Sequence, residues 1–285
     1  MNASPASADG SAMPAGPTTP AAPALLEIDG LTVRTPDGTA LVDGLGFSIR
    51  PGARLGLIGE SGSGKSLTSL AVTALLPSAL QSSGSVLLDG VQVIGAAEQA
   101  LRRLRGPVAS IVFQEPLTAL DPLMRLGKQV AEPLNRHRGL RGVELRAAVL
   151  DALRDVALPD VERIANAYPH EISGGQRQRV AIAIALASSP KLLIADEPTT
   201  ALDVTVQAEV LALLDRLVRE RGMALLFISH DLAVVSSLVD DVVVMQAGRA
   251  VEHGPVRQVL SAPRHPYTTA LVASARALDD ALEER

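Results

Sequence analysis

The sequence at residues 59–66, Gly-Glu-Ser-Gly-Ser-Gly-Lys-Ser, fits the pattern G-x-x-x-x-G-K-[ST]. The mostly apolar run at 54–58 before it predicts a buried strand, and residues 67–76 after it predict a helix. A glycine-rich turn between a strand and a helix presents backbone N–H groups to an anion, and the helix N-terminus adds a partial positive charge. The stretch therefore predicts a loop that binds the phosphates of a nucleotide.

Two residues of this loop carry specific chemistry. Lys65 is expected to reach the β- and γ-phosphates, and the Ser66 hydroxyl is expected to ligate Mg²⁺. A flexible Gly/Ser turn that fits the pattern by chance is disfavoured, because a strand and a helix flank the loop. The expected nucleotide-binding residues here are Gly59, Glu60, Ser61, Gly62, Ser63, Gly64, Lys65, Ser66 and Leu67.

The composition is that of a globular chain. Its 285 residues are 47% hydrophobic and 20% charged, which suits one large α/β domain with a subdomain, or two small domains. The net charge of −5 argues against nucleic acid as a partner, since proteins that bind a phosphate backbone usually present a basic face. The absence of cysteine excludes disulfides and thiolate metal sites.

The N-terminal residues differ from the rest of the chain. Residues 1–24 are mostly Ala, Pro, Ser, Gly and Thr, and the first basic residue is Arg34, so we expect a disordered tail and not a signal peptide. No apolar run approaches the length needed to span a bilayer; residues 180–187 form one of the longest. We expect a soluble chain that is held at a membrane only by partners.

Beyond the tail, the pattern of apolar residues divides the chain into three parts. Short strand-like runs punctuated by Gly and Pro turns predict an antiparallel β subdomain, and they lie at 25–28, 31–33, 40–42, 47–49 and in a hairpin at 85–91. After a further strand at 108–113, residues 115–172 show helical spacing and no clear strand, which predicts an inserted helical subdomain. From residue 180 a helix, a strand (192–195), a helix (203–221) and a strand (224–228) alternate as in α/β folds.

Two carboxylates follow the apolar strand at 192–195. A strand buried on both faces would deliver Asp196 to its carboxyl end, where open α/β sheets bind ligands. Asp196 is expected to hold Mg²⁺ through water, and Glu197 to polarise the attacking water as a general base. The alternative is a solvated acidic turn, which the phosphate-binding loop makes the weaker interpretation.

A second glycine-containing turn precedes a helix at residues 173–176. Its residues are Ser173, Gly174, Gly175 and Gln176, and the arrangement again suits phosphate binding at a helix N-terminus. Taken alone, it predicts no more than an N-capped helix behind a turn. One chain cannot easily aim two such termini at one γ-phosphate, so we expect another subunit to supply the second.

Two single polar residues also end predicted strands. Gln114 follows the run at 108–113, where its amide could touch Mg²⁺ or the attacking water, and His230 follows the strand at 224–228, where its imidazole could bond the γ-phosphate. For a lone Gln after a strand, or for one of five histidines, a structural role is the more common outcome. Their significance depends on the parts around them.

Together these parts resemble the ATPase subunit of an ABC transporter over roughly residues 25–275. The resemblance implies a P-loop (RecA-like) ATPase core of α/β type, with an antiparallel β subdomain and an inserted α-helical subdomain at about 115–172. It places the ATPase domain at 25–255 and a C-terminal extension at 256–285. The matching parts are Walker A (59–66), Q-loop Gln114, signature (173–176, preceded by Ile172 where Leu is usual), Walker B Asp196 and Glu197, D-loop Ala201-Leu202-Asp203, and switch His230.

Longer stretches are similar to the oligopeptide/dipeptide/nickel import branch of that family. They are residues 113–122 (Phe-Gln-Glu-Pro-Leu-Thr-Ala-Leu-Asp-Pro), 129–134, 168–171 (Tyr-Pro-His-Glu) and 265–268 (His-Pro-Tyr-Thr). The resemblance implies an ATP-hydrolysing subunit that powers import of peptides or of a related small solute such as nickel. An exporter subunit and a soluble, non-transport ABC ATPase remain alternatives.

The resemblance also implies partners and cofactors. Two such subunits, identical or paralogous, would sandwich two ATP molecules with Mg²⁺, each site pairing one subunit's Walker A with the other's signature and Asp203. Closure would act on two transmembrane permease subunits at the cytoplasmic face of the cell membrane, and an extracytoplasmic substrate-binding protein would deliver the cargo. Glu197, His230 and Gln114 are the catalytic residues that the resemblance implies.

Two features depart from the family pattern. The cysteine cluster that members of this branch can carry near the C-terminus is absent, because the chain has no cysteine. The aromatic residue on which these ATPases usually stack adenine is also missing from residues 31–38. Arg34 is the candidate to replace it, by laying its guanidinium on the base.

Overall fold

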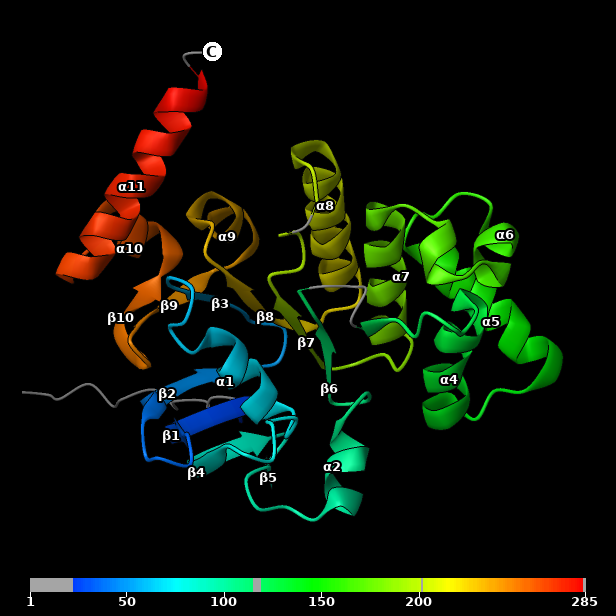
Figure 1. Cartoon of the computed structure of the whole chain (residues 1–285), viewed down its shortest axis with the longest axis horizontal. Helices are drawn as coiled ribbons and strands as arrows, with labels where there is room; N and C mark the ends of the chain where they lie inside the picture. The colour runs from blue at the N-terminus through cyan, green and yellow to red at the C-terminus, as the bar shows by residue number, and fades with distance from the viewer. Residues whose placement is uncertain (1–22, 115–118, 201, 284–285) are drawn as a thin grey trace, which may run out of the picture.

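Two β-sheets and a lobe of helices make up the chain in the computed structural model, which describes residues 23–114, 119–200 and 202–283 (Figure 1). The strands are β1 (Leu26–Arg34), β2 (Ala40–Ile49), β3 (Arg54–Ile58), β4 (Gln81–Leu88), β5 (Val91–Gln92), β6 (Ala109–Val112), β7 (Leu192–Asp196), β8 (Ala224–Ser229), β9 (Asp241–Gln246) and β10 (Arg249–Pro255). The helices are α1 (Lys65–Val72), α2 (Glu98–Leu104), α4 (Leu126–Arg138), α5 (Gly142–Asp155), α6 (Val161–Asn166), α7 (Gly174–Leu186), α8 (Val204–Glu220), α9 (Leu232–Leu238), α10 (Val256–Ser261) and α11 (Pro266–Glu283), with a 3₁₀ turn η1 (Pro169–Glu171).

The central sheet has the order β10-β9-β3-β8-β7-β6. Its neighbours from β9 to β6 pair in parallel, and β10 closes one edge antiparallel to β9. Every residue of β7 and β8 is buried, and apart from Asp196 and Ser229 at their ends both strands are continuous apolar runs, as is typical of parallel strands covered on both faces. Because the strands are parallel, the segments that follow β3, β6, β7 and β8 all begin on the same side of the sheet, at the carboxyl ends of the strands. We call this side the sheet edge.

Alternate residues of these strands face two different cores. Leu193 and Phe227 pack in a cluster that continues into the helical lobe, whereas Ile194 and Leu226 pack in a cluster shared with α1 and the antiparallel sheet. The sheet is therefore covered on both faces, as the predicted α/β core requires.

The antiparallel sheet, with the order β2-β1-β4-β5, confirms the predicted β subdomain. The prediction of separate strands at 25–28 and 31–33, with a break at Asp29 and Gly30, is wrong, because β1 continues through both residues as one strand. A shift in the pairing register absorbs Asp29 and Gly30 as an irregularity. The runs at 40–42 and 47–49 are likewise parts of the single strand β2. The hairpin at 85–91 is present, and its first strand begins at Gln81.

The helix after the phosphate-binding loop differs from its prediction at both ends. It begins at Lys65, directly after Gly64, and ends at Val72 instead of residue 76. Ala74 adopts a left-handed backbone with φ 52°, and the Leu75 N–H donates to the Leu70 carbonyl, which terminates the helix.

The described part of the predicted helical insert, residues 119–172, contains α4, α5, α6 and η1 and no strand. Helix α7, predicted at 180–187, begins earlier at Gly174, and α8 agrees closely with the prediction.

Residues 1–22, 115–118 and Ala201 lie outside the described residues, and with them most of the predicted tail. The domain boundaries at 24/25 and 255/256 stay predictions. Among the described helices, none combines the length and apolar character that crossing a bilayer demands.

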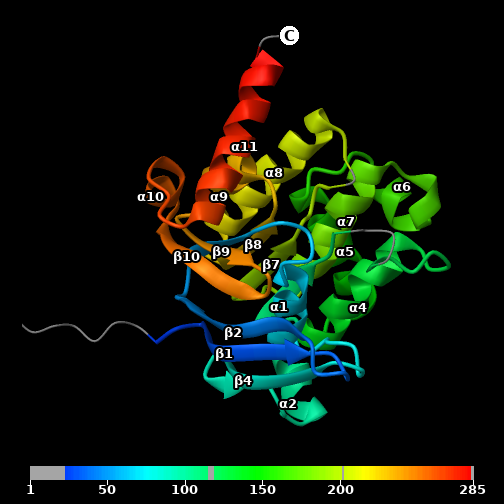
Figure 2. The same ribbon diagram turned by 60° about the vertical axis from the view of Figure 1, so that its left-hand side comes forward.

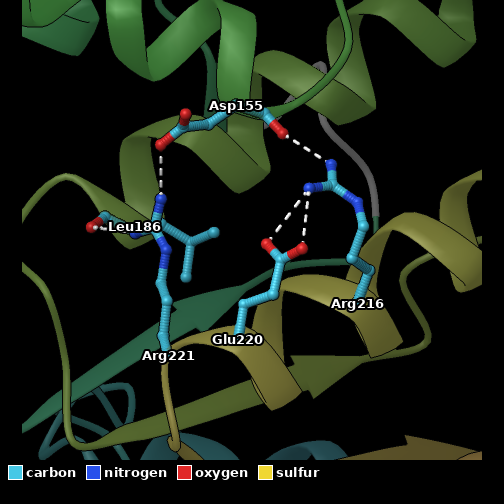
Figure 3. A network of polar contacts seen from close by, with 5 residues as sticks. All are labelled: Asp155, Leu186, Arg216, Glu220 and Arg221. Carbon is cyan, nitrogen blue, oxygen red and sulfur yellow. Dashed lines mark hydrogen bonds and ion pairs between the residues drawn. The ribbon is translucent and has the colours of Figure 1, made fainter.

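Arginines of the α8 end tie the helical lobe to the core (Figure 3). The Arg221 guanidinium donates to the Asp155 carboxylate at 2.7 Å and to the Leu186 carbonyl at 3.3 Å. Arg216 donates to the Asp155 carbonyl at 2.9 Å and pairs with Glu220. Exposed ion pairs of this kind contribute little free energy singly. The elements that they join, α5, α7 and α8, also share one apolar cluster.

The C-terminal helix packs on the core at its start and projects away from it at its end. This helix, α11, packs against α9, and its last turns project away from the remaining elements in both views (Figures 1 and 2). The start of α11 is held by Glu252 of β10, whose carboxylate accepts hydrogen bonds from the N–H groups of Arg264 at 2.9 Å and His265 at 3.0 Å.

The contacts of Glu252 make the attachment of α11 to β10 depend on pH. Burial raises the pKa of the Glu252 carboxyl, but the His265 N–H, the Thr268 hydroxyl, the Arg264 N–H and the nearby His265 ring together outweigh burial and hold the pKa below its ordinary value of 4.5. The ionised form is thus favoured by folding, so its stabilisation is present above pH 4.5 and lost as the pH falls through the lowered pKa. We expect Glu252→Gln to reduce the free energy of unfolding at pH 7 by about 1 kcal/mol, a hydrogen-bond contribution discounted for solvent screening.

Urea unfolding of the wild type and Glu252→Gln between pH 7 and pH 3 measures this difference. It should shrink toward zero at the acidic end. A difference that stays constant with pH would contradict a role for the carboxylate charge.

Candidate functional site

The loop at 59–66 has the backbone that its glycines predict. Gly59 and Gly64 have φ values of 152° and 97°. A Cβ atom on Gly59 would lie 2.2 Å from the Met245 carbonyl oxygen, and one on Gly64 would lie 2.8 Å from the Leu41 carbonyl oxygen. Only glycine fits both positions, so the loop closes tightly between β3 and α1.

Lys65 is folded back over this loop. Its side chain is buried, and its ammonium donates to the carbonyls of Gly59 at 2.8 Å and Glu60 at 2.9 Å. Burial lowers the pKa of Lys65, and the carboxylates of Glu197 and Asp196 oppose that shift. The ammonium is thereby held at the loop, where it can also donate to an incoming oxyanion.

Asp196 and Ser66, each of which the sequence analysis assigned to Mg²⁺, meet at the end of β7. The buried Asp196 carboxylate accepts hydrogen bonds at 3.0 Å from the hydroxyls of Ser66 and Ser69. Burial raises the pKa of Asp196, and the two hydroxyl donors act against it. A hydroxyl beside a carboxylate supplies the hard oxygen donors that Mg²⁺ prefers, with its other positions left to phosphate and water. No group of three or more His, Asp or Glu side chains suited to a metal occurs among the described residues, so an all-protein cage is absent there.

Glu197 and His230 lie side by side at the same sheet edge. The Nδ1 atom of His230 is 3.3 Å from the Glu197 carboxylate, which also accepts a hydrogen bond of 3.0 Å from the Thr200 hydroxyl. Glu197 has φ 46°, an uncommon conformation for a residue with a side chain, and its N–H donates to the Ile228 carbonyl of β8. Strained backbone of this kind clusters at functional sites, because the surrounding structure must hold it.

Lys65, Ser66, Glu197 and His230 share one open pocket of about 690 Å³, and Asp196, which is not among its lining residues, contacts it through the hydrogen bond from Ser66. Gln114 lines it, together with the loop at 59–62, residues 64–67, Glu197 and His230. Leu41 and Leu271 also line it, and the sequence analysis missed both. Leu271 follows Tyr267 by one helical turn, so helical spacing behind the motif at 265–268 was the available signal.

Other predicted site residues lie elsewhere. Ser173 caps α7 through a reciprocal pair of hydrogen bonds with Gln176, at 3.1 and 3.3 Å, and neither residue lines the pocket. Asp203 caps α8 by accepting from the Val206 N–H at 3.0 Å. A Cβ on Gly175 would lie 2.5 Å from a Val206 methyl, so the first turns of α7 and α8 pack closely against each other.

Arg34 also lies outside the pocket lining. Its guanidinium donates to the Gly38 carbonyl at 3.0 Å, within the turn between β1 and β2. The contact of Arg34 with adenine stays a prediction.

Sequence comparisons identify proteins related to this chain. A family model described as ABC transporter matches residues 42–200. A protein of Brucella ovis described as a candidate peptide import ATP-binding protein is 49% identical over 249 residues, covering 85% of this chain and 74% of that relative. The peptidoglycan transport ATP-binding protein YejF of Agrobacterium fabrum is 48% identical over 255 residues, covering 88% of this chain and 47% of its own length.

Solved structures share the fold. A dimeric, post-hydrolysis structure of the ATP-binding cassette MJ0796 bound to ADP and Pi has a TM-score of 0.71 at 28% identity, covering 81% of this chain and 99% of that one. The cbiO1 subunit of the Clostridium perfringens transporter complex cbiONQ has a TM-score of 0.72 at 30% identity, covering 84% and 91%. With the family model matching more than half of the chain and the pocket assembled as described, the chain belongs to the ABC transporter family and is one of its ATP-binding ATPase subunits.

Proposed function

We propose that the chain is the motor subunit of a peptide importer, binding ATP in the pocket beside β3, β7 and β8. The observation that carries the ATPase part is the meeting of Lys65, the Ser66–Asp196 pair and the Glu197–His230 pair at one sheet edge. The names of its relatives, peptide import and peptidoglycan transport ATP-binding proteins, support the transport part.

The pocket residues suit hydrolysis of the γ-phosphate. Backbone N–H groups of the loop and the Lys65 ammonium would bind the β- and γ-phosphates. Mg²⁺, when bound at Ser66 and Asp196, would neutralise phosphate charge. The Glu197 carboxylate would accept a proton as water attacks the γ-phosphorus and the bond to the ADP oxygen breaks. His230 would bond the γ-phosphate, and Gln114 would contact the water or the cation.

A second cassette would complete each site. The signature residues at 173–176 lie outside the pocket of their own chain, so this phosphate-binding turn would act on the nucleotide of a partner, as would Asp203. The dimeric structure of the neighbour MJ0796 supports this arrangement. Two permease subunits would hold the dimer at the cytoplasmic face of the membrane, and an extracytoplasmic binding protein would select the peptide.

Turnover measurements test both parts of this proposal. For the isolated chain, ATP hydrolysis per subunit should rise steeply with protein concentration, because each site needs the signature of a partner. Adding the permease subunits and a peptide-loaded binding protein in proteoliposomes should raise it further and drive peptide uptake.

Two results would count against the proposal. A concentration-independent rate from a proven monomer would argue against the shared site. Stimulation by a nickel-loaded binding protein and not by a peptide-loaded one would assign the motor to a different cargo.

A further inference from the structure

The C-terminal helix touches the phosphate-binding loop directly. The Tyr267 hydroxyl accepts a hydrogen bond of 2.9 Å from the Glu60 N–H, across 207 positions of sequence. Burial raises the pKa of Tyr267, so the hydroxyl stays protonated at neutral pH and accepts this bond as an uncharged group. One N–H of the loop is thus satisfied from outside the α/β core.

The face of α11 that carries Tyr267 also lines the nucleotide pocket. Tyr267, Leu271 and Ala275 follow at intervals of four residues and pack against the core cluster, and Val272 beside them is 5% exposed. Leu271 lines the pocket, and α11 packs on α9, the helix that begins directly after His230 and Asp231.

The position of this helix is set independently of any ligand. Glu252 holds the N–H groups of Arg264 and His265, and the Tyr267 N–H donates to His265 Nδ1 at 3.2 Å. These bonds fix the first turn of α11 against β10. Tyr267 and Leu271 are therefore preorganised beside the pocket.

Among the residues that the structure describes, no Phe, Tyr or Trp lines the pocket to stack on a nucleoside. The P-loop and its helix account for the phosphate end, and Leu41 and Leu271 are the apolar lining residues outside that stretch. Arg34 does not line the pocket. A purine face is largely apolar, so aliphatic side chains can exclude water from it.

We propose that α11 is part of the nucleotide site: Tyr267 positions the P-loop through Glu60, and Leu271, with Leu41, forms the apolar wall against the nucleoside of a bound purine nucleotide. This inference rests on the proposed ATP site. It predicts separable effects, because Leu271 would act on the base and sugar whereas Tyr267 would act on the phosphates.

Calorimetric titration of the full chain with ATP and with inorganic triphosphate tests the wall. Leu271→Ala should weaken ATP binding about fivefold, as expected for losing part of one leucine's apolar contact, and leave triphosphate binding unchanged. Leu260→Ala is the matched control, since Leu260 is a half-buried leucine of α10 that packs on the same cluster and lines no part of the pocket. It should leave both affinities unchanged, and Leu271→Met should bind as the wild type.

Tyr267→Phe tests the positioning role by removing the hydroxyl alone. It should weaken ATP and triphosphate alike, about threefold, the effect of losing one hydrogen bond. Hydrogen exchange of a peptide spanning residues 59–64 should become faster, which loss of packing elsewhere in α11 would not produce.

The outcomes separate this inference from the site on which it rests. If the wild type binds neither ligand, the proposed ATP site and this inference both fail. If Lys65→Ala weakens binding while the Leu271 and Tyr267 variants match the wild type in affinity and exchange, only the role of α11 fails. An ATP-selective loss in Arg34→Ala with none in Leu271→Ala would overturn the apolar wall in favour of the guanidinium.

Discussion

Glu197→Gln should lower ATP turnover by roughly 10²–10⁴-fold, the usual contribution of a positioned general base. Glutamine keeps the shape of the side chain and an oxygen for the Thr200 hydroxyl bond, but it cannot take the proton of the attacking water. The loop, Lys65 and Asp196 are untouched, so ATP binding should remain intact. We therefore expect ATP to accumulate in the closed dimer, since hydrolysis is the step that reopens it.

Single-turnover hydrolysis, calorimetric ATP binding and size-exclusion chromatography with ATP measure the three parts of this expectation. Glu144→Gln, a matched change at an exposed position of α5, should behave as the wild type in all three. Hydrolysis by Glu197→Gln at the wild-type rate would show that another group accepts the proton.

Lys65→Ala should instead weaken the binding of ATP itself. The buried ammonium is expected to donate charge-assisted hydrogen bonds to phosphate oxygens. Losing such a bond should weaken ATP binding by about 10- to 100-fold. The change also leaves the carbonyls of Gly59 and Glu60 without their donor, so the empty loop should exchange its amide hydrogens faster.

Two variants separate charge from shape at this position. Lys65→Met keeps the length of the stem and should lose affinity like the alanine variant. Lys128→Ala, which removes an exposed lysine of α4, should leave ATP binding unchanged. Wild-type affinity in both Lys65 variants would place the phosphates away from the loop.

Much of the site was predictable from short stretches of sequence. The loop at 59–66 needs glycine where φ is positive, and its neighbours already read as a strand and a helix. Asp196, Glu197, Gln114 and His230 each end an apolar run that becomes a parallel strand. Because parallel strands present their carboxyl ends at one edge, these residues had to converge once the runs were recognised as neighbours.

The errors came where pairing or packing outweighed local signals. Asp29-Gly30 looks like a turn, yet β1 passes through it because β2 and β4 pair with the strand on both sides. Helix α1 stops at Val72, although Ala74, Leu75 and Leu76 are good helix formers, because Ala74 adopts a left-handed backbone. Ser173 is a different case: it caps α7 through its bond with Gln176 and lies outside the pocket of its own chain, and its predicted contact with the nucleotide of a partner stays a prediction.

The sequence by itself determined the phosphate-binding loop, the order of the polar residues behind it and the family that this order identifies. These features depend on backbone angles and strand ends, which a few adjacent residues specify. Only the tertiary structure decided that Tyr267 would meet the Glu60 N–H, that Leu271 would line the pocket and that Arg34 would not. Such contacts join segments that are distant along the chain, and they exist only because the packing of α11 on α9 and the hold of Glu252 on its first turn bring the segments together.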